Sequence, residues 1–149
     1  MNSGAYWMRE SFAALWMDVR DLSHTECDAL LRTFMDQCVR VDLQRRFPED
    51  FRGGCVRPRH FLHRPVTVSR EDAIDTVFRK EAGKDLHLRG DIMWGTASAL
   101  HFEGTIERPL GDLAVIDGDA ICRLQVGTHQ RWVFLPHDDE GLWLIHGER

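Results

Sequence analysis

Apolar and polar side chains alternate in residues 100–107, LHFEGTIE. A period of two is typical of a β-strand with one face on a core and the other face toward polar surroundings. Two hairpins are predicted beyond this strand, because apolar runs flank the turn sequences Asp117-Gly118-Asp119 and Asp138-Asp139-Glu140-Gly141. The flanking runs are residues 113–116 and 120–126 for the first hairpin, and 132–135 and 142–146 for the second. From about residue 86 onward the sequence therefore predicts an antiparallel meander.

The first third of the chain shows helical spacing instead. Apolar residues three and four apart predict one helix within residues 5–21 and a longer one from Ser23 to Arg45 or Arg46. The second helix opens on the capping-box sequence Ser-His-Thr-Glu at residues 23–26. Prolines and glycines interrupt residues 46–68, where short strands are expected at 60–62 and 66–68. A third helix is predicted from its cap, Ser69, to about residue 82.

Helices at the front and strands behind predict an α+β fold, with the N-terminal helices packed in a strongly curved antiparallel sheet. The chain has 149 residues, of which 43% are hydrophobic. This length suits a single domain over residues 1–149. The helix within residues 1–22 is either part of that domain or an extension of it.

The balance of charge also limits the expected partners. There are 24 acidic and 19 basic residues, a net charge of −5, so a nucleic-acid partner is not expected. Residues 51–70 nevertheless hold five arginines and no acidic residue. Such a segment suits an anionic ligand or an acidic partner surface, or it pairs with acids on the helices or at a dimer interface.

Targeting signals and cysteine spacing indicate the compartment. No signal peptide is recognisable at the N-terminus, no apolar run is long enough to span a membrane, and no membrane partner is expected. The four cysteines include no Cys-x-x-Cys pair, which predicts buried free thiols. Such thiols are typical of a reduced, cytoplasmic protein.

Two short motifs add to the order of the predicted elements. Residues 68–74, VSREDAI, precede and begin the predicted third helix, and residues 131–135 and 142–146 form the closing hairpin around an acidic-Gly turn. Both motifs and the element order resemble the nuclear-transport-factor-2-like superfamily, which includes the SnoaL-like proteins. The resemblance implies a cystatin-like cone in which the sheet curls around one end of the helices and leaves an apolar cavity. Members include isomerases, cyclases, dehydratases, epoxide hydrolases and non-catalytic binding modules, and none of their catalytic signatures is matched here residue by residue.

Four ionisable residues are candidates for acid–base catalysis: His101, Asp91, Glu103 and His146. His101 and Glu103 share one strand face, and Asp91 on the preceding strand and His146 on the last strand can approach the same pocket. A dry pocket moves the pKa of such a group toward neutrality. Either His101 or Asp91 is then the base, with Glu103 or His146 as acid or orienting partner. The alternative is that His101 and Glu103 lie on the solvated side of an amphipathic strand.

Aromatic residues are the candidates for lining the cavity, and a metal is not expected. The candidate rings are Trp16, Phe34, Trp94, Phe102, Trp132 and Trp143. Ordinary core packing is the alternative for most of them. Cys55, His60 and His63 lie close in sequence but lack a fourth ligand nearby, so no metal site is predicted. No cofactor is predicted either.

The expected function is the binding of a small, largely apolar molecule. If the pocket is catalytic, the expected chemistry is cofactor-free isomerisation, cyclisation, dehydration or water addition. The alternative is a non-catalytic binding or interaction module whose open sheet face forms a homodimer. A closed pocket with two ionisable groups in hydrogen-bond reach of each other would favour the first interpretation.

Overall fold

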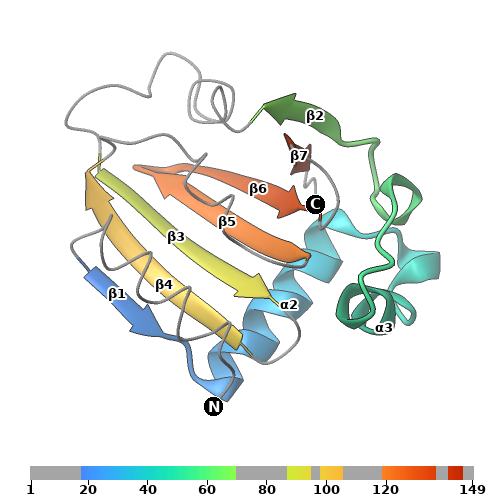
Figure 1. Ribbon diagram of the computed structural model, residues 1–149, viewed down its shortest axis with the longest axis horizontal. Helices are drawn as coiled ribbons and strands as arrows, with labels where there is room; N and C mark the ends of the chain where they lie inside the picture. The colour runs from blue at the N-terminus through green and yellow to red at the C-terminus, as the bar shows by residue number, and fades with distance from the viewer. Residues whose placement is uncertain (1–17, 70–86, 95–97, 106–118, 137–140, 146–149) are drawn as a thin grey trace.

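A seven-stranded sheet is the centre of the computed structural model, which describes residues 18–69, 87–94, 98–105, 119–136 and 141–145. The strands are β1 (Asp18–Asp21), β2 (Val66–Ser69), β3 (His87–Trp94), β4 (Ser98–Thr105), β5 (Ala120–Val126), β6 (His129–Leu135) and β7 (Gly141–Ile145). They pair antiparallel in the order β1-β4-β3-β5-β6-β7-β2, with β1 and β2 at the edges and no closure into a barrel (Figure 1).

Two α-helices lie within the same described ranges. They are α2 (His24–Cys38) and α3 (Phe47–Arg52), and the 3-10 turns Val41–Leu43 and Pro58–His60 lie near α3 in the sequence. Neither helix is long and apolar enough to cross a membrane. The predicted α+β class is confirmed.

The predicted strand pattern is confirmed in β4 and in the closing hairpin. Leu100 and Phe102 are buried on one side of β4, and His101 and Glu103 project from the other. β6 and β7 pair as predicted, and the run 120–126 is β5, which pairs with both β6 and β3. The predicted strand 113–116 and most of both predicted turns lie outside the described residues.

Helix α2 runs across one face of the sheet (Figure 1), and an apolar core lies between them. The helix contributes Cys27, Leu30, Phe34 and Cys38, whose spacing of three and four turns them to one side. The sheet contributes an aligned row across β3, β5, β6 and β7, formed by Met93, Ile121, Phe134 and Trp143. The opposite face of the sheet carries a second apolar core, which includes Leu88, Ile92, Phe102 and Leu124.

The start of α2 follows the predicted capping box. The hydroxyl of Ser23 accepts a hydrogen bond from the Glu26 N–H at 3.1 Å, and the Glu26 carboxylate accepts one from the Ser23 N–H at 3.0 Å. Two N–H groups that the first helical turn leaves without a partner are thereby satisfied.

The end of α2 differs from the prediction, because the helix stops at Cys38 and not near residue 45 or 46. Val39 has an extended backbone and pairs with Phe61, and the Leu62 N–H donates to the Cys38 carbonyl at 2.8 Å. A partner from further along the chain therefore takes a carbonyl that another helical turn would have used. The apolar pattern of residues 39–46 contains no sign of this partner.

The predicted helix within residues 5–21 is wrong for its last four residues, which form β1. β1 pairs with the exposed edge of β4, where Val19 stands opposite Phe102 and packs against the second core. Four residues fit a helical period and a strand period equally well, so the available backbone partner decides the conformation. Residues 1–17, with Trp16 among them, lie outside the described residues.

Residues 46–69 hold more regular structure than predicted. Pro48 stands in the first turn of α3, where the missing N–H of proline costs no helical hydrogen bond. Phe47 and Phe51 are buried in the core under α2. The predicted strand 66–68 is confirmed within β2, which pairs with β7, whereas the predicted strand 60–62 is reduced to one bridge at Phe61. Ser69 ends β2, and residues 70–82 of the predicted third helix lie outside the described residues.

Gly90 leaves room for the ring of Phe102, its partner across β3 and β4. A Cβ at position 90 would clash with Cζ of the Phe102 ring, which is fully buried. We expect Gly90→Ala to lower the free energy of unfolding by about 1–3 kcal/mol, the usual cost of overpacking a core. Urea denaturation measures this change. The cost should shrink in a Phe102→Leu background, and an equal cost in both backgrounds would contradict the steric explanation.

All four cysteines are free thiols, and three of them are buried. Burial raises the pKa of the Cys38 thiol to about 12 and also raises the pKa of Cys27 and Cys122. Cys55 is exposed, so the prediction of buried thiols is wrong for this residue. We expect Ellman's reagent to react rapidly with one thiol per native chain and with all four after unfolding. A Cys55→Ser variant should lose the rapid reaction, and a second fast thiol would contradict the burial of Cys27, Cys38 or Cys122.

Candidate functional site

A row of polar side chains crosses the face of the sheet that α2 covers. Pairing between strands sets Arg20 of β1 opposite His101 of β4, and His101 opposite Asp91 of β3. Asp91 in turn stands opposite Arg123 of β5, which stands opposite Trp132 of β6. Directly paired residues of antiparallel strands project to the same face. The register thus places residues from five strands in one row. On β3, β5 and β6 this row lies two residues along each strand from the apolar row that contains Met93, Ile121 and Phe134.

Asp91 is the centre of this row, and only 8% of the residue is exposed. Its Oδ1 lies 2.9 Å from His101 Nδ1. Its Oδ2 accepts hydrogen bonds from Arg123 Nη2 at 2.9 Å and from Arg123 Nε at 3.3 Å. Both carboxylate oxygens therefore have a partner, and the guanidinium offsets a charge whose burial is otherwise costly.

His101 continues the contacts from Asp91 toward the surface. Its Nε2 lies 3.0 Å from one carboxylate oxygen of Glu103, and the other oxygen lies 2.9 Å from Nε2 of His87, which is exposed. Hydrogen bonds with the two rings lower the pKa of Glu103. The structure thus brings together three of the predicted catalytic residues, and the side chain of His101 is only 20% exposed. The fourth, His146, lies outside the described residues.

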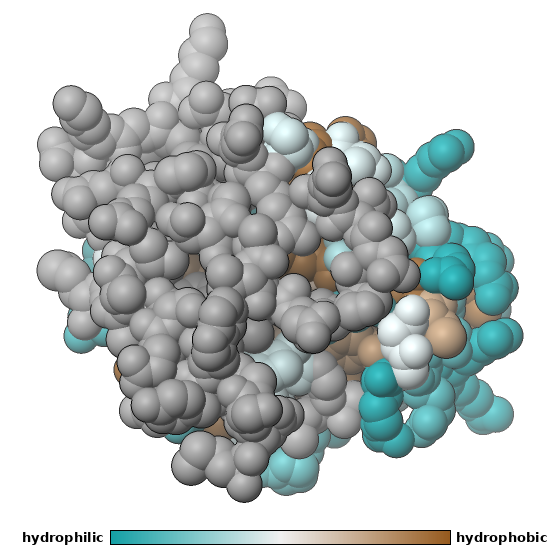
Figure 2. All heavy atoms as spheres, in the orientation of Figure 1, coloured by the Kyte–Doolittle hydropathy of each residue, from teal (hydrophilic) through white to brown (hydrophobic). Residues whose placement is uncertain are grey.

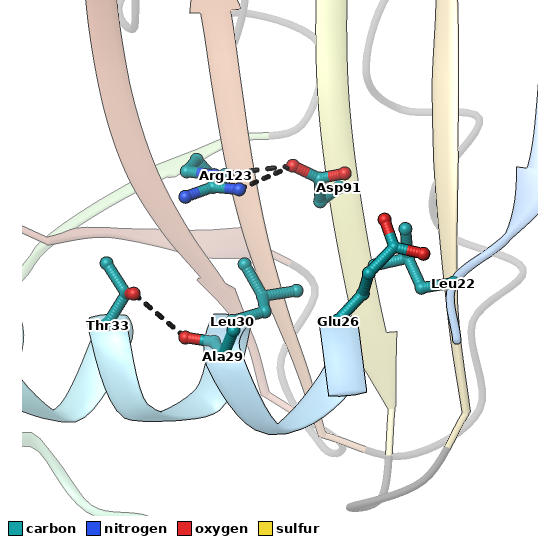
Figure 3. A pocket seen from close by; sticks show the side chains of 7 residues that line it. All are labelled: Leu22, Glu26, Ala29, Leu30, Thr33, Asp91 and Arg123. Carbon is teal, nitrogen blue, oxygen red and sulfur yellow. Dashed lines mark hydrogen bonds and ion pairs between the residues drawn. The ribbon is translucent and has the colours of Figure 1, made fainter. Parts of the chain in front are cut away.

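A shallow pocket of about 160 Å³ lies between the polar row and the N-terminal half of α2 (Figure 3). The sheet lines it with Asp91 and Arg123. The lining from α2 and the residues just before it consists of Leu22, Glu26, Ala29, Leu30 and Thr33. Figure 3 shows the helical side chains reaching toward the sheet from successive turns of α2. The pocket therefore joins a small apolar surface to a charged one, and it opens to solvent.

Glu26 is already ion-paired where it lines the pocket. Arg20 donates to its two carboxylate oxygens at 3.2 and 3.1 Å. The hydrogen bond from Arg20, followed by the one from the Ser23 N–H, lowers the pKa of Glu26 to about 2. The carboxylate that caps α2 thus also ties β1 to the start of the helix.

The pairing of Glu26 predicts a loss of stability in acid. The unfolded chain protonates Glu26 near its ordinary pKa of 4.5, and the folded chain does so only near 2. Because the unfolded state binds more protons between these values, stability falls as the pH is lowered through this window. We expect Glu26→Gln to weaken this dependence, measured as the urea midpoint from about pH 5 to about pH 2. Identical acid dependence in the variant and the wild type would contradict the pairing.

The Arg123 guanidinium is held on a second side by an aromatic ring. Its central carbon lies 5.5 Å from the centre of the Trp132 ring, a cation–π distance. The Trp132 N–H donates to the Gln37 side chain of α2 at 2.7 Å. Asp91 and Trp132 together therefore fix both the position and the plane of this guanidinium.

No family model matches the chain, and comparisons with curated proteins and with solved structures find no match.

Sequence reasoning missed most of the residues that line the pocket. Arg123 carried a usable signal, because it is the one charged residue in the apolar run AICRLQV of residues 120–126. A charged side chain in such a run either faces solvent or has a paired role. Glu26 was identified as a helix cap only. The sequence does not indicate that the other lining residues face a pocket, because this depends on which strands α2 covers. They are Leu22, Ala29, Leu30 and Thr33.

The aromatic candidates do not line this pocket. Phe34, Trp132 and Trp143 belong to the core under α2, whereas Trp94 and Phe102 belong to the core on the opposite face of the sheet. These five rings pack as core residues, and Trp132 reaches the pocket only through Arg123.

The arginine-rich segment lies away from the pocket. Three arginines of residues 40–52, which lead into this segment, pair with acids close by in sequence, as Arg40–Asp42, Arg46–Asp50 and Arg52–Glu49. Four more are exposed and have no acidic partner among the residues that the structure describes: Arg45, Arg57, Arg59 and Arg64. Figure 2 shows hydrophilic side chains gathered at the end of the molecule where α3 lies in Figure 1. Pairing with acids therefore accounts for part of this segment only.

His60 has a structural environment. It is fully buried, its Nδ1 accepts the Arg57 N–H at 3.0 Å, and its Nε2 lies 2.8 Å from Asp50 Oδ2. Both ring nitrogens thus hold the segment after α3 in place. In the described ranges, no group of three or more His, Cys, Asp or Glu side chains is arranged to hold a metal ion.

Proposed function

We propose that the pocket between α2 and the polar row binds a small molecule, and that Asp91 exchanges a proton with it. The observation that carries this proposal is a nearly buried carboxylate that lines a pocket and is held by Arg123 and His101. A buried ion pair is a poor source of stability, because the desolvation of both charges offsets their attraction. Paired ionisable groups in a cleft are more typical of functional sites.

The three predicted residues take different roles in this proposal. Asp91 lines the pocket and is the proposed base. His101 does not line it, so it acts through Asp91 as a positioning residue that can hold a proton on Nδ1. Glu103 orients the His101 ring from the other side. Cofactor-free isomerisation, cyclisation, dehydration and water addition each need one proton taken and one returned, and the choice among them stays a prediction.

The dimensions of the pocket limit its ligand. An apolar cavity of about 150 Å³ holds a molecule of the size of benzene, whereas drug-sized ligands occupy about 300 Å³ or more. The pocket here measures about 160 Å³. We therefore propose a ligand whose enclosed part is about one ring in size, with its apolar surface against Leu22, Ala29 and Leu30.

The overall shape and the compartment belong to the same proposal. We propose the cone-shaped fold of the nuclear-transport-factor-2-like superfamily, supported by the antiparallel sheet with α2 on one face and by the closing β6–β7 hairpin. We also propose a cytoplasmic location, supported by the four free thiols.

A fragment titration of the isotope-labelled protein, followed by backbone amide NMR, tests the binding proposal. We expect one-ring fragments to shift amides of residues 22–33, 91 and 123. Ala29→Leu should weaken binding, because this exposed helix position lines the pocket and the longer side chain enters it. Thr25→Leu is the control, since it places the same leucine side chain at an exposed position of α2 outside the lining.

The outcomes separate the two predicted functions. Binding that Ala29→Leu weakens and Thr25→Leu does not would support the pocket. If no fragment binds and sedimentation shows a stable dimer, the small-molecule proposal fails and a homodimeric interaction module is favoured.

A further inference from the structure

Each carboxylate oxygen at the pocket already has at least one hydrogen-bond partner. Both oxygens of Asp91 are contacted by Arg123 or His101, and both oxygens of Glu26 are contacted by Arg20. The Thr33 hydroxyl donates to the Ala29 carbonyl at 2.8 Å. A carboxylate oxygen can accept two hydrogen bonds, so Asp91 Oδ1, which contacts His101 alone, keeps one position for the proton that the proposed function has it exchange.

Arg123 has several N–H groups that Asp91 does not use. A guanidinium has five N–H groups, and Asp91 uses one on Nε and one on Nη2. Figure 3 shows the second terminal nitrogen, Nη1, directed away from Asp91, on the side where Leu30 and Thr33 line the pocket. No further hydrogen bond joins this guanidinium to another residue of the described ranges. Among the described residues, one N–H on Nη2 and two on Nη1 therefore have no hydrogen-bond partner.

The charges around the pocket are balanced. Arg20 pairs with Glu26, and Arg123 pairs with Asp91, so these four groups carry no net charge. A singly charged anion on Arg123 therefore meets less repulsion than a doubly charged one. A doubly charged phosphate would bring its second charge close to Asp91 and Glu26, where like charges in a partly buried site are costly.

We propose that the ligand of this pocket carries a carboxylate, which accepts the unused N–H groups of Arg123. This inference rests on the proposed function and adds the chemical class of the ligand. The two terminal nitrogens of a guanidinium form a planar fork that matches both oxygens of a carboxylate. The apolar body of the ligand lies against Leu22, Ala29 and Leu30, which line the same pocket.

Three one-ring probes of nearly equal size test the charge of the ligand: benzoate, benzamide and benzamidine. Each is titrated into the full-length protein at neutral pH and constant ionic strength, and amide NMR shifts give its dissociation constant. We expect benzoate to bind at least tenfold more tightly than neutral benzamide. We expect cationic benzamidine to bind no better than benzamide.

Substitutions at position 123 test the residue. Arg123→Gln should remove the preference for benzoate and leave the binding of benzamide within about twofold. Arg123→Lys keeps the positive charge beside Asp91, so it can be tested even if Arg123→Gln folds poorly. It should lose most of the preference for benzoate over benzamide, because lysine lacks the planar fork of a guanidinium. Arg131→Gln is the matched control, since Arg131 is exposed on β6 and does not line the pocket. This control should bind benzoate like the wild type.

Each outcome decides either this inference or the function on which it rests. If benzoate and benzamide bind equally, or if benzamidine binds more tightly than benzamide, the proposal that the ligand carries a carboxylate is overturned. The proposal that the pocket binds a small molecule then still stands. Benzoate binding that is unchanged in Arg123→Gln overturns the role of Arg123. Absence of binding by all three probes overturns both proposals.

Discussion

We expect Phe34→Ala to lower the free energy of unfolding by about 3–5 kcal/mol, the range found when a buried aromatic side chain is cut back to alanine. Phe34 is fully buried. Its ring centre lies 5.2 Å from that of Trp132 on the sheet, 5.6 Å from that of Phe47 on α3 and 6.1 Å from that of Phe61. One side chain thus joins α2 to the sheet and to the segment after it, so its loss leaves a cavity that no single neighbour can fill. Urea denaturation followed by circular dichroism measures the change.

Val41→Ala is the control for this prediction, because Val41 is an apolar residue that is 69% exposed. It should alter the free energy of unfolding by no more than about 0.5 kcal/mol. A loss below about 1.5 kcal/mol in Phe34→Ala would show that α2 does not pack on the sheet through this ring.

Asp91→Asn has the second largest expected effect, a loss of about 2 kcal/mol in the free energy of unfolding. Removing one member of a fully buried ion pair costs about 3–5 kcal/mol, because the other charge stays buried alone. The Arg123 side chain is 28% exposed, so its guanidinium can turn partly toward water and the expected cost is smaller. The substitution also leaves His101 without the anionic partner of its Nδ1. Urea denaturation at neutral pH measures the loss.

Asp42→Asn provides a matched comparison at the surface. Asp42 accepts two hydrogen bonds from Arg40, at 2.8 and 3.1 Å, but both side chains are largely exposed. An exposed pair of this kind contributes about 0–1 kcal/mol. Similar losses in Asp91→Asn and Asp42→Asn would contradict the buried placement of Asp91.

Local sequence patterns predicted the elements that are decided by neighbouring residues. The hydrogen bonds between Ser23 and Glu26 lie within four residues, so the capping-box sequence alone predicts the start of α2. The alternation of residues 100–103 predicted that His101 and Glu103 share a face and that Phe102 is buried. The closing hairpin was predictable for the same reason, because its two apolar runs flank one short turn.

Contacts between distant residues were beyond these patterns. Asp91 and Arg123 are 32 residues apart, and they meet because β5 pairs with β3 and not with β4, the strand that precedes it in the chain. Period-two alternation identifies which residues share a face, but it says nothing about which strands are neighbours. The end of α2 likewise depends on Phe61, and the conformation of residues 18–21 depends on the edge of β4. The candidate site was therefore predicted in its residues on β3 and β4 and missed on β5 and α2.

The most direct test of the account is an NMR measurement of nuclear Overhauser effects between bound benzoate and the methyl groups of the protein. Labelled methyls make the two faces of the sheet distinguishable. We predict contacts from the ring protons to the methyls of Leu22, Ala29 and Leu30, which line the pocket under α2. Contacts to the methyls of Leu88, Ile92 and Leu124, in the core on the opposite face, would contradict the proposal that this molecule binds its ligand beside Asp91 and Arg123.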